Sequence, residues 1–474
     1  MRKTKIICTL GPATDKPDVL ENLVKSGMNV ARMNFSHGTY EDHKRRIEEV
    51  KALREKHRVP LAIMLDTKGP EIRIGTFEND RVFLRPGHEF VLTTENVEGD
   101  ENHVTVKYKA LPKSLKKGDR LLFSDGLIET EVLETTESEI TLLIKNGGYL
   151  SNRKSINLPD TTLDMPYMNE TDMEDIRFGI ANGVDYIAAS FVRSADDIRS
   201  LRNFIKRVDE NCGVRIISKI ESEDGVKNIV EIVDESDGVM IARGDMGVEI
   251  ELERLPEIQK QIIKKCLGRG KISITATQML ESMITNPRPT RAEVTDIANA
   301  IYDGTSAIML SGETAAGEHP VESVLTMAKI AETTERAINY KKRFLNARFA
   351  KTSITKAISH ATHTTAMDLD AVAIVAVTQS GHTAYSVSGS RPYCPVIAVT
   401  PFEKVYHQLA LAWGVEPNVC KDINESCDMF LDAISYASEK ASLKNDDIVV
   451  ATGNNAPSES GTTNVLRVHT IKQR

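Results

Sequence analysis

The sequence predicts an α/β protein: a (β/α)8 TIM barrel with an inserted small antiparallel β-barrel domain and a C-terminal three-layer α/β domain. Three observations lead to this prediction. The first two thirds of the 474 residues alternate short apolar runs with helical segments, and one gap between two runs is far longer than the others. After about residue 340 a second alternating series begins. A doubly wound open sheet is the alternative architecture for the first series.

Eight β-rich runs mark the expected barrel strands. Each is almost continuously apolar, which is typical of parallel strands covered on both faces. The runs are Lys5–Leu10, Asn29–Phe35, Leu61–Asp66, Tyr186–Val192, Arg215–Ile220, Gly238–Ala242, Ile272–Thr277 and Ser306–Leu310. Helical periodicity lies between them, at Asp15–Ser26, Tyr40–Lys56, Met173–Asn182, Asp196–Val208 and Leu255–Leu267.

The long gap after the third run predicts an inserted β domain. Its short β-rich runs are separated by turn signals such as Glu98-Gly99-Asp100 and Lys117-Gly118-Asp119. The runs are Arg81–Leu92, Asn102–Tyr108, Arg120–Phe123, Glu129–Leu133 and Glu139–Ile144. Barrel active sites lie at the end where such a loop inserts, so the domain can act as a lid.

The last part of the chain predicts a separate α/β domain. Its strands are Ala371–Thr378, Pro395–Thr400, Val415–Cys420 and Ile448–Thr452, with a final extended run at Thr463–Ile471. We expect the barrel to comprise residues 1–69 and 166–340, the lid residues 70–165, and the C-terminal domain residues 341–474. The barrel's share is then close to the ~250 residues typical of that fold.

Composition excludes several classes of function. Lys and Arg number 60 against 68 Asp and Glu, a formal net charge of −8, and the basic clusters are scattered, which disfavours nucleic acid as a partner. The apolar runs are far shorter than the ~20 residues that span a bilayer, and the first one ends at Gly11-Pro12, unlike a signal peptide. Six dispersed cysteines form neither a disulfide framework nor a metal motif. We therefore expect a cytoplasmic protein.

Polar residues gather at the carboxyl ends of the expected barrel strands. Such groups are costly to bury without partners, so they indicate a charged ligand at the barrel mouth. The segments are Arg32–Gly38, Asp66–Arg73, Ser218–Glu221, Ala242–Asp245, Thr275–Gln278 and Ser311–Glu313.

Lys219, Glu221 and Asp245 predict a divalent-metal site. Lys219 and Glu221 are two apart on a strand, so their side chains point to the same side. The carboxylates of Glu221 and Asp245, with no His or Cys nearby, suit Mg2+ or Mn2+ that shares a phosphate. The alternative is an ion pair between Lys219 and Glu221 that caps the strand.

A second group of oxygen-bearing side chains has a single formal charge and therefore suits a weakly bound monovalent cation. Turn and N-cap hydrogen bonding explains these residue types equally well. The group is Asn34, Ser36, Asp66 and Thr67.

Arg32 and Arg73 are candidates for binding phosphate oxygens, although a surface ion pair is the commoner role for any one arginine. Together with Lys219 and a metal they would supply the positive charge that phosphoryl transfer needs.

The sequence has no GxxxxGK[ST] motif, no GxGxxG opening a helix and no protein-kinase signature, so a nucleotide would bind by another route.

The motifs taken together resemble pyruvate kinase, in order and from residue 3 onward. They are Met33–Gly38, Asp66–Arg73, Ile217–Glu221, Ala242–Asp245, Ala276–Met283, Asn286–Glu293, Met309–Thr314 and Ser460–Asn464. The resemblance implies transfer of a phosphoryl group from phosphoenolpyruvate to ADP, which yields pyruvate and ATP in glycolysis. It also implies a barrel, a lid and an effector-binding domain.

The resemblance assigns a role to each matching residue. The implied catalytic residues are Lys219, Arg32, Arg73, Thr277, Ser311 and Glu313, the last two as a proton relay to the enolate. The implied substrate-binding residues are Arg32, Lys219, Ala242, Arg243, Gly244, Asp245 and Thr277. Asn34, His37 and Arg73 would bind the nucleotide, Glu221 and Asp245 would hold Mg2+ (or Mn2+), and Asn34, Ser36, Asp66 and Thr67 would bind K+. Glu71 matches the residue of K+-dependent members.

In the C-terminal domain the resemblance implies an allosteric site for a phosphorylated small molecule. The implied effector-binding residues are Thr378, Ser380, Gly381, Thr383, Ser460, Gly461 and Thr462. The loop Gly453–Ser460 has no basic residue and carries Glu459, which disfavours fructose 1,6-bisphosphate and leaves a sugar or nucleotide monophosphate. A homotetramer is implied, and the chain is expected to lack the extra C-terminal domain of some bacterial members.

Two other functions fit parts of the pattern. A metal-dependent barrel lyase or aldolase acting on a pyruvate enolate would share Glu221 and Asp245, but would need neither the lid nor Lys219. A catalytically silent metabolite sensor would have lost Lys219, Glu221 or Asp245, and all three are present.

Overall fold

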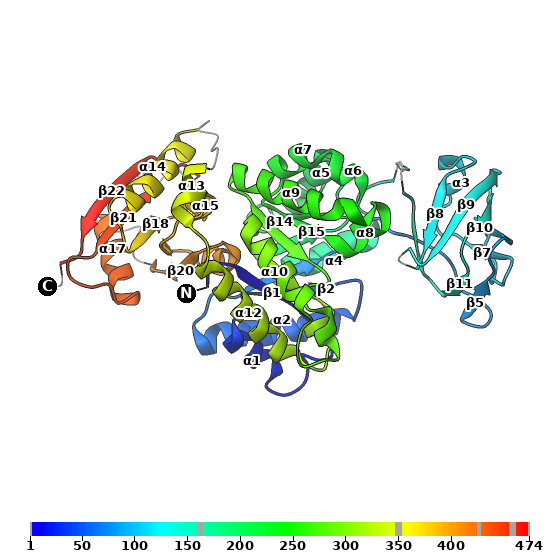
Figure 1. Cartoon of the computed structure of the whole chain (residues 1–474), viewed down its shortest axis with the longest axis horizontal. Coiled ribbons are helices and arrows are strands. Elements are labelled where there is room, and N and C mark those ends of the chain that lie inside the picture. The colour runs from blue at the N-terminus through cyan, green and yellow to red at the C-terminus, as the bar shows by residue number, and fades with distance from the viewer. Residues whose placement is uncertain are drawn as a thin grey trace.

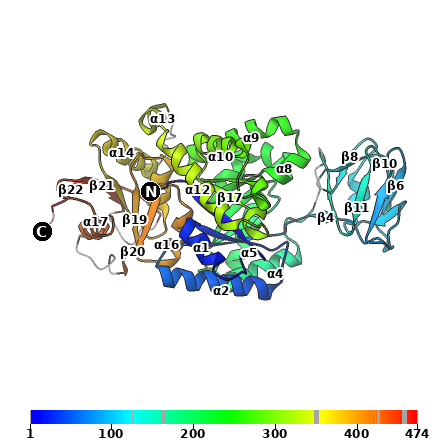
Figure 2. The same ribbon diagram turned by 60° about the horizontal axis from the view of Figure 1, so that its bottom comes forward.

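The computed structural model describes the chain except residues 1, 125, 160, 162–164, 347–352, 422, 424–427, 455–460 and 473–474. The C-terminal domain, the barrel and the inserted domain follow one another along the long axis of the molecule, with the barrel in the middle (Figure 1). The same order is visible after rotation (Figure 2). Within the described residues, no helix has the length and apolar character needed to cross a membrane.

Eight parallel strands close into a barrel, which confirms the predicted fold and excludes the open sheet. Neighbours follow the order β1-β17-β16-β15-β14-β13-β3-β2, and β2 pairs with β1 to close the ring. The strands are β1 (Lys5–Leu10), β2 (Val30–Asn34), β3 (Ala62–Asp66), β13 (Tyr186–Ala189), β14 (Arg215–Ile220), β15 (Gly238–Ala242), β16 (Ile272–Ala276) and β17 (Ala307–Leu310). Every predicted run contains one of them, within a few residues at each end.

Helices surround the barrel, and the longer ones bury an apolar face against it. They are α1 (Val19–Ser26), α2 (Tyr40–His57), α4 (Glu170–Ala181), α5 (Ala195–Val208), α6 (Glu223–Lys227), α7 (Ile229–Glu235), α8 (Arg243–Glu249), α9 (Leu255–Arg269), α10 (Arg291–Asp303), α11 (Gly312–Ala315) and α12 (Pro320–Arg336). Short 3-10 turns lie at Leu252–Arg254 and Glu281–Ile284.

Helix α1 begins four residues later than predicted. Asp15 lies outside the helix because its carboxylate accepts two hydrogen bonds from Arg46, at 2.8 and 2.7 Å. Asp18, directly before the helix, has the left-handed backbone conformation, with φ at 62°. A tertiary ion pair has therefore replaced the first helical turn.

The inserted domain is a curled seven-stranded sheet with its own apolar core. An isolated antiparallel bridge from Ile74 to Val106 joins its two edges, which gives the barrel-like shape. The elements are β4 (Ile72–Arg73), β5 (Arg81–Leu84), β6 (Glu89–Thr93), β7 (His103–Thr105), α3 (Leu111–Ser114), β8 (Arg120–Phe123), β9 (Ile128–Thr135), β10 (Glu139–Ile144), β11 (Gly148–Ser151) and β12 (Ser155–Asn157). β5 pairs with β11 apart from the main sheet.

Two details of the insert differ from the prediction. The run Arg81–Leu92 is two strands, because a turn that contains Pro86 and Gly87, the latter with φ at 80°, divides it. The pair β6 and β7 is parallel, whereas the rest of the sheet is antiparallel. β4, β11 and β12 are two to four residues long, too short to show a period.

The C-terminal domain has a five-stranded sheet between two helical layers. Strand order is β20-β19-β18-β21-β22, and the last pair is antiparallel. α14, α15 and α16 cover one face and α17 the other. The elements are α13 (Tyr340–Asn346), α14 (Ile354–Asp368), β18 (Ala373–Val377), α15 (His382–Gly389), β19 (Val396–Thr400), α16 (Glu403–Gln408), the 3-10 turn Leu409–Leu411, β20 (Val415–Val419), α17 (Met429–Lys440), β21 (Ile448–Gly453) and β22 (Val465–Thr470).

The C-terminal domain closes the amino end of the barrel. Ala410 and Leu411 belong to the same buried apolar cluster as the inward-facing barrel residues Ile7 and Ile217. The buried ammonium of Lys5 donates to the Val415 carbonyl at 2.8 Å. The opposite, carboxyl end of the strands is therefore the end at which a small molecule can enter.

Candidate active site

Lys219 is the centre of a buried polar cluster at the carboxyl ends of β3, β13 and β14. Its side chain is nearly buried, and its Nζ lies 2.6 Å from Ser190 Oγ, 2.9 Å from Glu221 Oε1 and 3.1 Å from Asp66 Oδ1. Burial alone lowers the pKa of Lys219, but the charges of Asp66 and Glu221 outweigh it and hold the pKa above the ordinary value. The ammonium is therefore charged at neutral pH.

Asp66 joins Lys219 to Arg32. Its Oδ2 accepts from Arg32 Nε at 2.6 Å, and Arg32 also donates to the Thr9 hydroxyl at 2.8 Å. Burial raises the pKa of Asp66, whereas Arg32 and Lys219 lower it, and the net shift is downward. Two cations share this one carboxylate, so Asp66 fixes the positions of both Lys219 and Arg32.

Glu221 and Asp245 lie close enough for their charges to interact. Glu221 is 1% exposed, its Oε2 accepts from the Phe191 amide at 2.6 Å, and it pairs with Lys219. Burial first, opposed by Lys219 and reinforced by Asp245, raises the pKa of Glu221 to about 7. The capping ion pair thus exists, yet it leaves two neighbouring carboxylates that repel each other.

This donor set fits a divalent cation. Hard oxygen ligands from two carboxylates, completed by water and substrate oxygens, are the usual protein environment of Mg2+. No group of three or more His, Cys, Asp or Glu side chains suitable for a metal is found among the described residues. The protein would thus supply two ligands and the substrate the others.

The predicted monovalent-cation residues come from two adjacent strand ends. Asn34 on β2 and Asp66 on β3 are register partners, and Thr67 follows directly. Thr67 is buried and its hydroxyl accepts from the Ser190 amide, while the Asn34 side chain accepts from the exposed Ser36 amide at 3.1 Å. The structure therefore brings these residues to one side of the mouth, with their side chains in hydrogen bonds of the kind expected from turns.

Arg73 and His37 lie at the rim. Arg73, on β4 of the inserted domain, is 44% exposed and pairs with Glu71 at 2.6 Å. His37 is exposed, and its carbonyl lies 2.9 Å from His43 Nε2. A cleft of about 130 Å3 between the inserted domain and the barrel is lined by Glu71, Asp245 and other residues. A ligand at the mouth would therefore contact both domains.

Thr277 is held in a strained conformation beside Gly244. Its φ is 67°, unusual for a β-branched residue, and its hydroxyl accepts from the Gly244 amide at 2.8 Å. The Arg243 side chain points away from the mouth, because it pairs with Asp296 at 2.7 Å and donates to the Thr277 carbonyl at 2.6 Å. Arg243 thus shapes the loop, and its backbone, together with Ala242 and Gly244, faces Thr277.

Ser311 and Glu313 are bonded to each other at the end of β17. The buried Glu313 carboxylate accepts from the amides of Ser311, at 2.7 Å, and Leu280, at 3.0 Å. Burial raises the pKa of Glu313 despite these bonds. A carboxyl group with a raised pKa is suited to hold or move a proton near neutral pH.

Three residues of the site escaped the sequence analysis. Ser190 and Thr9 belong to the fourth and first strands, the two whose ends carry isolated polar residues rather than a cluster. Reading these two ends in the same way would have found them. Glu249, at the end of α8, bonds to Asn157 of the inserted domain; burial raises its pKa to about 7, and no local signal marks it.

The predicted effector residues meet in the C-terminal domain. The Thr383 and Thr463 hydroxyls are 2.8 Å apart, so the first turn of α15 lies against the segment that contains Gly461 and Thr462. Gly381 has φ at 83°, and a Cβ there would lie 2.9 Å from the Tyr385 ring. Thr378 is buried and Ser380 half-buried, whereas Ser460 and Glu459 lie outside the described residues.

Comparison with known proteins decides the family. Residues 1–324 match the family model of the pyruvate kinase barrel domain, and residues 356–469 match that of the pyruvate kinase alpha/beta domain. The chain belongs to the pyruvate kinase family. It is therefore a phosphotransferase, as the sequence predicted.

Individual pyruvate kinases are similar along almost the whole chain. The pyruvate kinase of Sporosarcina psychrophila is 47% identical and that of Staphylococcus haemolyticus 45%, each over 99% of this chain and 81% of the relative. The crystal structure of a pyruvate kinase from Cryptosporidium parvum has a TM-score of 0.92 at 36% identity, covering 99% of this chain and 96% of that one.

Proposed function

We propose that the barrel mouth transfers the phosphoryl group of phosphoenolpyruvate to ADP, with Lys219 stabilising the group in flight. The observation that best supports this proposal is the buried Lys219 ammonium, which contacts three oxygen-bearing side chains at the end of β14. Phosphoryl transfer passes through a loose transition state with its charge spread over oxygens, so a fixed cation stabilises it more than it stabilises the substrate.

The remaining residues would position the reactants. Arg32 and Arg73 would contact phosphate oxygens from the barrel side and the lid side, with Asn34 and His37 near the nucleotide. The amides of Arg243 and Gly244, next to Ala242, would hold the substrate carboxylate, and Thr277 would face the reacting carbon. Arg243 would act through its backbone, because its side chain is engaged by Asp296. Ser311 and Glu313 would deliver the proton to the enolate.

Metal ions would complete the site. Glu221 and Asp245 would hold Mg2+ or Mn2+, which supplies positive charge to phosphate oxygens when bound. Asn34, Ser36, Asp66 and Thr67 would bind K+. Glu71, which pairs with Arg73, is the residue type of the K+-dependent members.

Regulation is proposed at the C-terminal domain. Thr378, Ser380, Gly381, Thr383, Gly461 and Thr462, with Ser460 beyond the described residues, would bind a phosphorylated small molecule. Small residues with free amides at the start of α15 suit a phosphate.

We further propose a cytoplasmic homotetramer. The three domains would correspond to residues 1–69 with 166–340, 70–165 and 341–474.

The direct test supplies purified protein with phosphoenolpyruvate, ADP, Mg2+ and K+ and follows pyruvate. We expect ATP and pyruvate in equal amounts, and slower turnover when Na+ replaces K+ at constant ionic strength. Absence of turnover at every effector concentration tried would overturn the proposal. Pyruvate formed with inorganic phosphate in place of ATP would show hydrolysis of phosphoenolpyruvate, and would also overturn transfer to ADP.

A further inference from the structure

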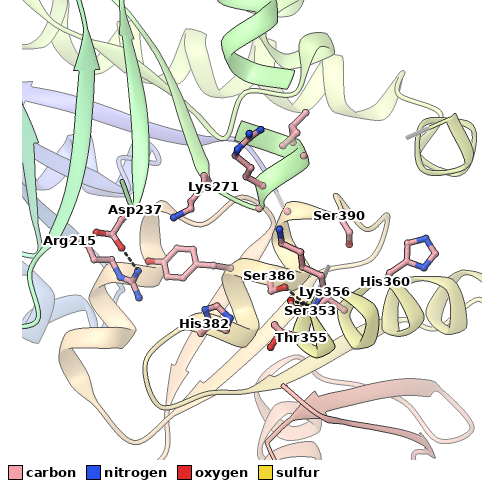
Figure 3. A pocket seen from close by; sticks show the side chains of 17 residues that line it. Arg215, Asp237, Lys271, Ser353, Thr355, Lys356, His360, His382, Ser386 and Ser390 are labelled. Carbon is pink, nitrogen blue, oxygen red and sulfur yellow. Dashed lines mark hydrogen bonds and ion pairs between the residues drawn. The ribbon is translucent and has the colours of Figure 1, made fainter. Parts of the chain in front are cut away.

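A second cavity lies at the opposite end of the barrel from Lys219, between the barrel and the C-terminal domain. Its volume is about 210 Å3. Arg215 and Lys271 face it from the starts of β14 and β16, and Lys356 and His382 face it from α14 and α15 (Figure 3). Arg215 and Lys219 are four residues apart on β14, which separates their backbones by about 13 Å. None of the predicted active-site or effector residues lines this cavity.

Positive charge exceeds negative charge in the lining. Four basic residues, Arg215, Arg269, Lys271 and Lys356, face one carboxylate, Asp237. Arg215 already pairs with Asp237 at 3.2 Å, and Arg202 does so at 3.3 Å. Asp237 is therefore shared by two arginines, and Arg269 pairs instead with Asp234, outside the lining, at 2.7 Å.

The two lysines are compensated less: burial lowers the pKa of Lys271, and the charges of Asp237 and Asp234 offset only part of this shift. Lys271 Nζ donates to the Ser236 carbonyl at 2.6 Å and the Asp234 carbonyl at 3.3 Å. Among the described residues, no ion pair joins Lys271 or Lys356 to a carboxylate. Partial burial first, and then the charges of Arg215 and Lys271, lower the pKa of His382. The cavity therefore has an excess of positive charge.

Hydroxyl groups surround these cations on the side of the C-terminal domain. Ser353 caps the first turn of α14, and Thr355, Ser359, Ser386 and Ser390 also line the cavity. The Ser359 and Ser386 hydroxyls are 2.8 Å apart, so they are already oriented toward the same space. Cationic side chains and hydroxyls around a helix start are the groups that bind phosphate oxygens.

We propose that this interdomain cavity is a binding site for a small phosphate monoester, at the opposite end of the barrel from the active site and on the barrel side of the loop before α15, where Arg215 donates to the Ser380 carbonyl at 2.6 Å. Two unpaired lysines match the two charges of a phosphate dianion, and the volume admits a small metabolite but not a polymer. Such a ligand would contact Lys271 on the barrel and Lys356 on the C-terminal domain at once. Binding would therefore strengthen the junction between the two domains.

The test is titration calorimetry with inorganic phosphate at constant ionic strength, with chloride as the balancing anion. The pocket variant is Lys271→Gln/Lys356→Gln, and the control is Lys264→Gln/Lys444→Gln, which removes two exposed lysine charges elsewhere. A third variant, Thr383→Val, removes a hydroxyl from the first turn of α15. Phosphate bound at the barrel mouth is common to all variants and remains as a constant background.

We expect the pocket variant to lose at least about tenfold in affinity for one phosphate that the control and Thr383→Val retain, whereas Thr383→Val should weaken only a second phosphate, bound at the start of α15. Equal affinity in the wild type and the pocket variant would overturn the proposal, and so would a loss confined to Thr383→Val. If the double variant does not fold, the single variant Lys356→Glu on the first turn of α14 replaces it in the same titration, and the same loss of phosphate affinity is expected. The measurement needs no turnover, so its result does not depend on whether the protein catalyses the proposed reaction.

Discussion

The two ends of strand β14 carry opposite balances of charge. At the carboxyl end, Lys219 is surrounded by Asp66 and Glu221, with Asp245 nearby. At the amino end, Arg215 and the adjacent Lys271 exceed the single carboxylate Asp237. The two ends therefore suit different partners. Surplus carboxylates suit a metal that binds phosphates together with the protein, whereas surplus cations suit an anion alone.

The largest effect is expected at the carboxyl end of β14, where Lys219 lies. Lys219→Met should reduce kcat by about 10³-fold, because a fixed cation at the transferring group is lost. Binding of phosphoenolpyruvate, measured by calorimetry, should persist. Lys5→Met is the matched control, since Lys5 is also buried in the barrel but at the amino end. Wild-type turnover in Lys219→Met would show that the lysine is only structural.

The second prediction tests whether the Glu221 carboxylate is a ligand of Mg2+. Glu221→Gln should raise the Mg2+ concentration for half-maximal rate by at least about tenfold, since it removes one charged ligand. Chelation of divalent ions should abolish turnover in the wild type, and added Mg2+ should restore it. An unchanged Mg2+ requirement in Glu221→Gln would leave the ion pair with Lys219 as the sole role of this residue.

The third prediction tests whether the Ser190 hydroxyl positions Lys219 in the barrel mouth. Its hydroxyl lies 2.6 Å from Lys219 Nζ and donates to the Thr67 carbonyl at 2.7 Å, so it positions the lysine. Ser190→Ala should lower kcat about tenfold with little change in KM, and Ser190→Thr should recover part of it. Ser218→Ala is the control, because its buried hydroxyl contacts Ser236 instead. Equal losses in both alanine variants would indicate a general packing effect.

The last prediction concerns the amino end and the dependence of stability on pH. Burial first, and then Arg54, lower the pKa of His407 to about 3, near the junction with the barrel. Between pH 6.5 and 3 the unfolded chain binds a proton that the folded chain does not, so stability is lost as pH falls through this window. From pH 7 to pH 5 this amounts to about 2 kcal/mol. His407→Gln should lose less stability than the wild type over that range in urea unfolding; parallel losses would contradict the assignment.

The fold was predictable because its signals are local. Each barrel strand is one continuous apolar run such as Arg215–Ile220, and the carboxyl ends of parallel strands must meet at one end of a barrel. This rule alone placed Arg32, Asp66, Lys219 and Glu221 together, before any contact was known. Short elements such as β4 and β12 were missed because two or three residues cannot show a period.

The barrel, the insertion, the C-terminal domain and the polar strand ends follow from the order of residues along the chain, so they could be predicted before any contact was known. The tertiary structure decided which side chains share a proton, a charge or a cavity. Ser190 meets Lys219, Glu249 meets Asn157, and Lys271 faces Lys356 only after residues far apart in the chain are packed together. Burial and distance set these interactions, and neither is a property of a local segment.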